Sequence, residues 1–113
     1  MLTIYHNPRC SKSRQTLELI KKNSSKKINV IEYLKAQISQ ETIEKLLTQL
    51  SCSPIEMMRV KEAEFKEQNL KGANDKTLIA AMVTTPKLIE RPIVSDGNKA
   101  VIGRPPENAL TLC

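Results

Sequence analysis

The alternation of apolar and polar residues predicts that the chain begins with a strand followed by a helix. Leu2 to Tyr5 is a short run rich in β-favouring residues, and the next residues, 6 to 8, are typical of a turn. A helical pattern then extends from Cys10 to about Lys22, with Leu17 and Ile20 on its inner face. The turn therefore joins a strand to the start of a helix.

The remaining β-favouring runs predict three further strands. Ile28 to Tyr33 follows the first helix, and strand, helix and strand in this order form a βαβ unit with parallel strands. Near the end, Ile93–Val94 and Ala100–Ile102 flank Asp96–Gly97, which indicates a β-hairpin. After a break at residues 103–105, Pro106 is expected to open a final short helix through Leu112.

The middle of the chain is predicted to be helical. Ser39 is a suitable N-cap for a helix whose apolar face comprises Ile43, Leu46, Leu47 and Leu50. Ser53–Glu56 has the capping-box pattern and predicts a short helix that reaches Arg59. The charged stretch Lys61–Asn69 is expected to be irregular, and a third helix should run from about Asn74 to Pro86.

These elements predict an α/β fold with a four-stranded mixed sheet, in which the βαβ unit and the hairpin pair side by side. The helical block, about residues 39 to 85, is an insertion between the second and third strands. We expect the whole chain, 1–113, to form one domain, because its length suits a single hydrophobic core.

The composition limits the type of protein. No apolar run approaches the ~20 residues needed to cross a bilayer, and no cleavable signal is evident, so we expect a cytoplasmic protein without membrane contact. Three cysteines without a Cys-x-x-Cys spacing argue against a disulfide framework, and a single histidine argues against a metal site. We expect a monomer with no metal.

The net charge of +6 suggests an anionic partner. The densest basic cluster comprises Lys21, Lys22, Lys26 and Lys27, and it is interpreted as a helix end followed by a solvated loop. Aromatic residues are scarce and no nucleic-acid-binding motif is present, so we expect no nucleic acid partner.

Cys10 is the strongest candidate for chemistry. It stands at the start of a helix, where free backbone N–H groups and the helix dipole favour a thiolate. Arg9, Lys12 and Arg14 add positive charge nearby in the sequence. The alternative is that Cys10 is a small buried hydrophobic residue, as most intracellular cysteines are. The loop before the helix, the flanking cations and His6 favour a reactive thiol.

Four motifs in order resemble the glutaredoxin-coupled arsenate reductases of the thioredoxin fold. The first is Ile4–Arg14 (IYHNPRCSKSR), which is close to the family pattern Tyr-His-Asn-Pro-x-Cys-x-x-Ser-Arg. The others are Arg59 after the capped helix, Arg91–Val94 (RPIV) and Gly103–Glu107 (GRPPE). The resemblance spans essentially the whole chain and implies a thioredoxin-like fold.

The resemblance also implies roles for individual residues. Cys10 corresponds to the family's nucleophile, and His6 to the histidine that precedes it. Arg59, Arg91 and Arg104 correspond to the three arginines that bind the oxyanion. Guanidinium groups suit a tetrahedral oxyanion because their paired donors match its oxygens. Taken singly, each arginine is more readily interpreted as a surface residue in an ion pair, and His6 equally well as a hydrogen-bonded loop residue.

Three further positions refine this hypothesis. In thioredoxin-like folds the proline that enters the third strand is cis and lies beside the cysteine, which here is Pro92, although Arg-Pro alone leaves the isomer open. Thr16 stands where phosphatase-like reductases have an arginine, six positions after the nucleophile, so that loop is absent. Ser13 replaces the second cysteine of a Cys-x-x-Cys pair and is a supporting residue.

The implied activity is an oxidoreductase that reduces arsenate to arsenite, as in arsenic detoxification. Cys10 attacks arsenate, glutathione acts as co-substrate, and glutaredoxin removes the resulting mixed disulfide, so no cofactor is bound. One alternative is a glutathione-dependent thiol oxidoreductase with another substrate. The other is an Spx-type regulator that binds RNA polymerase, but Ser13 breaks the Cys-x-x-Cys switch typical of that class.

Overall fold

The structure is a computed structural model that describes all residues, 1–113. The chain divides into two compact units, which we describe separately. Unit 1 comprises Met1–Ala36 and Arg91–Cys113, and unit 2 comprises Gln37–Glu90. The helical insertion expected at about 39 to 85 lies within unit 2. That the chain is one domain stays a prediction.

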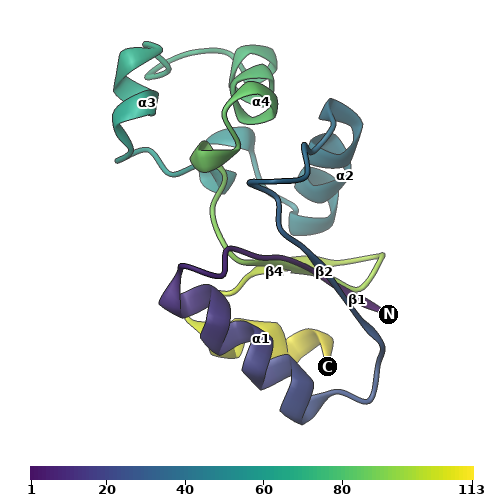
Figure 1. Cartoon of the computed structure of the whole chain (residues 1–113). Helices are drawn as coiled ribbons and strands as arrows, with labels where there is room; N and C mark the ends of the chain where they lie inside the picture. The colour runs from purple at the N-terminus through teal and green to yellow at the C-terminus, as the bar shows by residue number, and fades with distance from the viewer. The chain divides into compact units, whose positions relative to one another are not determined.

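Unit 1 is built on a four-stranded mixed sheet (Figure 1). Its strands are β1 (Leu2–Tyr5), β2 (Ile28–Ile31), β3 (Ile93–Ser95) and β4 (Ala100–Ile102), in the order β2-β1-β3-β4. β1 pairs parallel to β2 and antiparallel to β3, and β3 pairs antiparallel to β4. The predicted βαβ unit, hairpin and mixed sheet are therefore confirmed, and with them the thioredoxin-like fold class.

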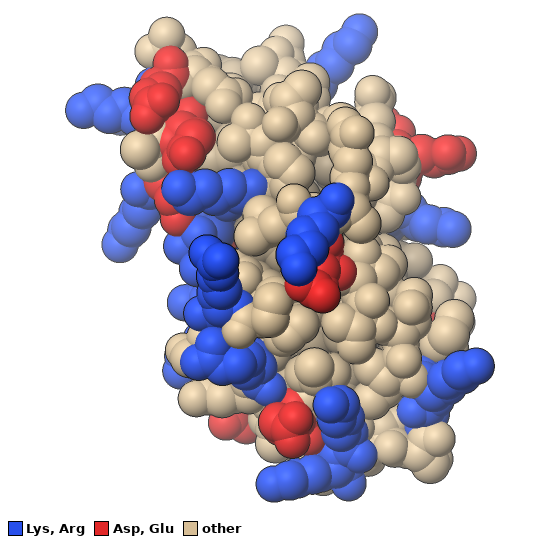
Figure 2. All heavy atoms as spheres, in the orientation of Figure 1, with Lys and Arg blue, Asp and Glu red and all other residues tan.

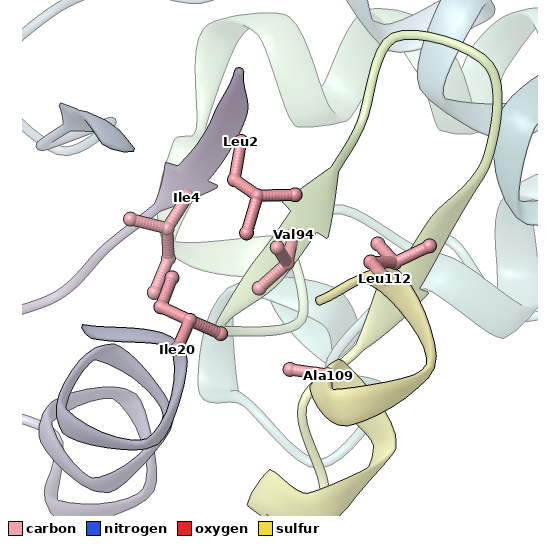
Figure 3. Close-up of a cluster of buried hydrophobic side chains, with 6 residues drawn as sticks. All are labelled: Leu2, Ile4, Ile20, Val94, Ala109 and Leu112. Carbon is pink, nitrogen blue, oxygen red and sulfur yellow. The ribbon is translucent and has the colours of Figure 1, made fainter. Parts of the chain in front are cut away.

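Two helical segments lie on the same side of this sheet and share its core. They are α1 (Ser11–Asn23) and η3 (Pro106–Leu112), which pack against each other (Figure 1). Between them and the sheet lies a cluster of buried apolar side chains, which Figure 3 shows: Leu2, Ile4, Ile20, Val94, Ala109 and Leu112. η3 has 3-10 geometry, and Pro106 opens it as predicted.

The inner face of α1 is more polar than the sequence pattern suggested. Ile20 is fully buried and Leu17 is partly buried, in line with the prediction. The other two fully buried residues of α1, however, are Ser13 and Thr16. Buried hydroxyl groups need hydrogen-bond partners, so this end of α1 is fixed by polar contacts rather than by apolar packing.

Unit 2 consists of helical segments. They are α2 (Gln40–Leu50), η1 (Pro54–Met57), α3 (Ala63–Glu67), α4 (Asp75–Thr84) and η2 (Pro86–Leu88). The predicted N-cap is confirmed at Ser39, whose Oγ accepts the N–H of Thr42 at 3.1 Å. The capping box at Ser53 is present, and Asn74 caps α4 by accepting the N–H of Thr77 at 2.9 Å. Such caps satisfy N–H groups that a helix leaves free.

Several predicted boundaries were wrong. β2 ends at Ile31, and the residues up to Tyr33 turn away from the strand. η1 ends at Met57 and does not reach Arg59. The stretch Lys61–Asn69 is not irregular throughout, because it contains α3, which buries Phe65. A single large apolar side chain in a charged stretch gives too weak a helical periodicity to be recognised.

The charged residues are spread over the surface. On the face shown in Figure 2, basic side chains project at several points, acidic groups lie among them, and uncharged residues form most of the surface between. This mixture agrees with the net charge of +6. No helix has both the length and the apolar character needed to cross a membrane.

Candidate active site

Cys10 is the N-cap residue of α1, at the end of the loop that leaves β1. The loop closes as a turn in which the N–H of Cys10 donates to the carbonyl oxygen of Asn7 at 3.0 Å. The carbonyl oxygen of Cys10 accepts the N–H of Arg14 at 3.0 Å, which is the first bond of the helix. The thiol is half-buried and forms no disulfide. Its sulfur therefore stands at a helix start, as the sequence predicted.

The surroundings of Cys10 hold the pKa of its thiol below the ordinary value. Burial alone raises this pKa, because it disfavours the charged form. The backbone N–H of Ser13, the charge of Arg91, the N–H of Lys12 and a hydrogen bond from Arg91 together outweigh burial. A thiolate is the nucleophilic form of cysteine, so the site favours the reactive state.

The cation that acts on Cys10 is not one of its neighbours in the sequence. Arg9 and the side chain of Lys12 are not among the groups that shift the pKa of its thiol. Arg14 instead donates from Nη1 to the carbonyl oxygen of Pro8 at 2.9 Å, which fixes the loop. The sequence correctly pointed to positive charge at Cys10, but the fold supplies it from Arg91.

The guanidinium group of Arg91 has donor atoms that no acceptor in the protein contacts. Its Nε and Nη1 atoms are buried and have no hydrogen-bond partner in the protein. A buried charged donor without a partner is costly, so an oxyanion that accepts from these atoms would be bound favourably. Arg91 precedes Pro92, and the peptide bond between them is cis, the isomer that the resemblance implied.

Arg104 lies on the segment beside Arg91. The N–H of Gly103 donates to the carbonyl oxygen of Pro92 at 2.9 Å, and Arg104 Nη1 donates to that of Arg91 at 3.5 Å. The Arg104–Pro105 bond is also cis, which the sequence did not reveal. The side chain of Arg104 is exposed. The structure thus brings two of the three predicted arginines onto adjacent segments of unit 1.

Arg59 belongs to unit 2 and is engaged in ion pairs there. Its guanidinium pairs with the carboxylate of Glu62 and lies 3.9 Å from that of Glu90. Lys87 also pairs with Glu62, at 3.7 Å. An anion would have to compete with these carboxylates for Arg59. Its role as an oxyanion ligand stays a prediction.

His6 contacts the loop through Ser13. The His6 ring is buried, and its Nδ1 lies 2.7 Å from Ser13 Oγ. The same Oγ accepts the N–H of Asn7 at 3.0 Å, so one hydroxyl links the strand end, the loop and α1. His6 is not among the groups that shift the pKa of Cys10. This geometry suits a residue that shapes the loop, and a catalytic role for His6 stays a prediction.

We expect protonation of His6 to destabilise the protein at acidic pH. Burial lowers the pKa of His6, Arg14 and Lys21 lower it further, and Glu32 opposes them. The unfolded state therefore binds a proton first, so stability falls as pH drops below the ordinary value of about 6.5. His6→Asn retains a polar group near Ser13 and removes this titration. Urea unfolding against pH should show a smaller acidic loss in the variant, and equal losses would contradict the expectation.

Gly103 is a site residue that the sequence pattern did not single out. An added Cβ would lie 2.7 Å from Thr16 Oγ1 and 2.9 Å from Pro92 Cγ. Both distances are shorter than real carbon contacts, so the segment that precedes Arg104 packs directly on α1 and on Pro92. Only glycine allows so close an approach. In the sequence, the only indication that Gly103 belongs to the site was its position in the motif Gly103–Glu107.

Replacement of Gly103 by alanine should therefore destabilise the fold by about 1–3 kcal/mol, the usual range for forced overpacking. Urea unfolding measures this change. Gly72→Ala is the matched control, because Gly72 has a positive φ of 77° but no atom within 4 Å of the new Cβ. The control is destabilised only by placing alanine at a positive φ, which costs about 1–2 kcal/mol, and involves no steric overlap. A Gly103→Ala variant as stable as the parent would show that the packing is looser than described.

The other two cysteines are free. Cys52 lies half-buried in unit 2, where burial and the charge of Glu56 raise the pKa of its thiol. Cys113 is exposed, and its Sγ lies 3.7 Å from the carbonyl oxygen of Ala109. The surroundings therefore act in opposite directions on the two half-buried thiols, because the pKa of Cys10 is lowered and that of Cys52 is raised.

Comparison with known proteins gives consistent matches over nearly the whole chain. The model of the ArsC family matches residues 5–112. An uncharacterized Escherichia coli protein, YfgD, is 49% identical over 112 residues, which cover 96% of this chain and 93% of that protein. An arsenate reductase of Haemophilus influenzae is 40% identical over 112 residues and 96% of each chain. The solved structure of an arsenate reductase from Vibrio cholerae superposes with a TM-score of 0.93 at 45% identity and covers 99% of this chain and 97% of its own.

Proposed function

Because the chain belongs to the ArsC family, we propose that it reduces arsenate to arsenite, with Cys10 as its single nucleophile and glutathione and glutaredoxin as external thiol donors. The observation that carries this proposal is the pairing of a low-pKa thiol with Arg91. Its buried Nε and Nη1 atoms have no partner, and its charge lowers the pKa of Cys10. A thiolate beside free guanidinium donors suits attack on an oxyanion.

In the first step the Cys10 thiolate attacks the arsenic atom. A sulfur–arsenic bond forms, and one arsenate oxygen takes up protons and leaves as water. Negative charge on the remaining oxygens is offset by hydrogen bonds from Arg91 and from Arg104 on the adjacent segment. Because the Arg91 guanidinium already acts on Cys10 before the reaction, this donor needs little reorganisation. Arsenic is still in its +5 state at this point.

The second step transfers two electrons. The thiol of glutathione supplies the second sulfur, and the sulfur–arsenic bond breaks with its electron pair left on arsenic. Arsenic is thereby reduced to the +3 state and leaves as arsenite, while Cys10 and glutathione become joined by a disulfide. A thiol of glutaredoxin then attacks this mixed disulfide and frees Cys10. The two thiols supply both electrons, so the cycle requires no bound metal or nucleotide.

An external thiol is proposed because Cys10 has no second cysteine beside it in a Cys-x-x-Cys pair. A disulfide requires Cα atoms within about 7 Å of each other. Cys52 belongs to unit 2, and burial raises the pKa of its thiol, which disfavours the thiolate. Cys113 is exposed and belongs to unit 1, so it is the stronger rival. Ser13 stands where a Cys-x-x-Cys pair would have its second thiol.

A second candidate function keeps the thiol chemistry and changes the substrate. The ion pairs of Arg59 with Glu62 and Glu90 favour it, because an arginine already paired with carboxylates contributes less to binding a free oxyanion. In that case the protein would act on glutathione mixed disulfides rather than on arsenate. The Cys10 thiolate would have the same role in both reactions.

A coupled assay distinguishes the two candidates. The protein is mixed with glutathione, glutaredoxin, glutathione reductase and NADPH, and NADPH oxidation is followed with and without arsenate. We expect oxidation that depends on both the protein and arsenate. The second test replaces arsenate by a mixed disulfide of glutathione and leaves out glutaredoxin, which itself reduces such disulfides. Turnover with the disulfide and none with arsenate would overturn the arsenate proposal and support the second candidate.

A further inference from the structure

We propose that Thr16 is a positioning residue that holds the segments bearing Arg91 and Arg104 against the helical turn that bears Cys10. Thr16 lies on the inner face of α1, and it is fully buried although it is polar. In the sequence it was notable only as the position where a phosphatase-type loop has its arginine, and that absence assigned Thr16 no role of its own. Its importance follows from the two segments that its hydroxyl group joins.

The hydroxyl group of Thr16 faces two carbonyl oxygens. The single proton of Oγ1 is shared between the carbonyl oxygen of Lys12, at 2.8 Å, and that of Gly103, at 3.3 Å, in a three-centre hydrogen bond whose shorter arm is to Lys12. The first bond stays within α1, in the turn whose Lys12 and Ser13 N–H groups lower the pKa of Cys10. The second bond crosses to the residue immediately before Arg104. One buried hydroxyl therefore connects the first turn of α1, whose N–H groups favour the Cys10 thiolate, with the segment that carries Arg104.

The packing around Gly103 leaves no free space between the two connected segments. A Cβ on Gly103 would lie 2.7 Å from Thr16 Oγ1, 3.0 Å from Thr16 Cγ2 and 2.9 Å from Pro92 Cγ. Thr16, Gly103 and Pro92 thus form a continuous contact from α1 to the residue that follows Arg91. Since the N–H of Gly103 also donates to the carbonyl of Pro92 at 2.9 Å, a shift at Thr16 is transmitted to both arginine segments.

An apolar residue would be the simpler choice if Thr16 only filled the core. Valine has nearly the same shape, and it avoids the cost of burying a hydroxyl group. Valine would, however, leave the Gly103 carbonyl without this donor and would put a methyl group where Thr16 Oγ1 now lies 2.8 Å from the Lys12 carbonyl. The hydroxyl therefore contributes a specific connection that shape alone does not supply.

The connection matters because Arg91 must stay close to the sulfur to act on it. Its charge and its hydrogen bond both lower the pKa of Cys10, and both weaken as the distance grows. Catalytic geometry is similarly sensitive, since a misplacement of about 1 Å can reduce a rate on the order of a hundredfold. Loss of the Thr16 hydroxyl should therefore affect the thiol and the oxyanion site together.

Two variants isolate the hydroxyl group. Thr16→Ala and Thr16→Ser both lose the Cγ2 methyl and differ only in the hydroxyl. In a Cys52→Ser/Cys113→Ser background, the ultraviolet absorbance of the thiolate is titrated with pH. We expect the midpoint of Thr16→Ala to rise by about half a unit or more, while Thr16→Ser titrates like the parent. In steady-state assays, kcat/KM for arsenate should fall about tenfold in Thr16→Ala only, mainly through KM.

A purely structural role predicts another pattern. In that case Thr16→Ala lowers the midpoint of urea unfolding but titrates like Thr16→Ser, and the proposal is overturned. Thr16→Val serves as the second hydroxyl-free variant, so the comparison does not depend on one substitution folding. The inference rests on the proposed function only in taking Cys10 as the reactive thiol. Its titration needs no arsenate turnover, so an unchanged midpoint refutes the role of Thr16, whereas a shifted midpoint without arsenate activity refutes only the proposed substrate.

Discussion

Replacement of Cys10 by serine is expected to abolish arsenate reduction, with a loss on the order of a thousandfold or more, as when a covalent nucleophile is removed. A serine hydroxyl neither ionises at neutral pH nor transfers electrons to arsenic. The fold should survive, because Cys10 is the N-cap of α1 and serine is among the best residues at that position. NADPH oxidation in the coupled assay measures the loss.

The matched controls for this variant are Cys52→Ser and Cys113→Ser, which make the same chemical change at the other two free thiols. Each should keep nearly full activity. Circular dichroism and urea unfolding should confirm that Cys10→Ser is folded. Substantial arsenate reduction by folded Cys10→Ser would show that another thiol is the nucleophile.

Arg91→Ala should have the next largest effect. It removes a charge-assisted donor pair from the anion site, worth about 1.5–3 kcal/mol, which corresponds to a roughly 10- to 150-fold loss in kcat/KM. It also removes the charge and the hydrogen bond that lower the pKa of Cys10. The pKa of the thiol should therefore rise, the thiolate fraction at neutral pH should fall, and the pH profile of alkylation should shift to higher pH.

Two other substitutions provide the comparison for Arg91→Ala. Arg91→Lys keeps the charge but loses the paired donors, so it should recover much of the thiol pKa and little of the oxyanion binding. Arg104→Ala removes an exposed side chain that is not among the groups acting on Cys10, so the alkylation profile should stay unchanged. If Arg91→Ala had the same kcat/KM for arsenate and the same pH profile of alkylation as the parent protein, the role of Arg91 would be structural.

The fold was largely predictable because its signals are local. The strands from Leu2 and Ile28 and the hairpin around Asp96–Gly97 follow from short β-favouring runs and from turn residues. The caps at Ser39 and Asn74 follow from residue type and spacing. The apolar periodicity did not predict α3, because its buried residue, Phe65, lies between charged residues.

The candidate site was predictable only in part, because its decisive contacts join distant parts of the sequence. The position of Cys10 at a helix start could be recognised from the turn and the pattern that follow β1. The local pattern did not give the partnership of its thiol with Arg91, which only the family resemblance indicated, because this contact depends on β3 lying beside β1 in the sheet. The role of Thr16 was not predicted for the same reason, because its contact with Gly103 exists only in the folded chain.

The most direct test of the proposed mechanism is arsenate turnover by the Cys52→Ser/Cys113→Ser variant, in which Cys10 is the only thiol. The variant is assayed with arsenate, once with glutathione, glutaredoxin and glutathione reductase, and once with thioredoxin and its reductase. We predict activity equal to the parent with the glutathione system and little with thioredoxin. Loss of activity with glutathione and glutaredoxin would mean that Cys52 or Cys113 resolves the intermediate, which contradicts a single-cysteine mechanism.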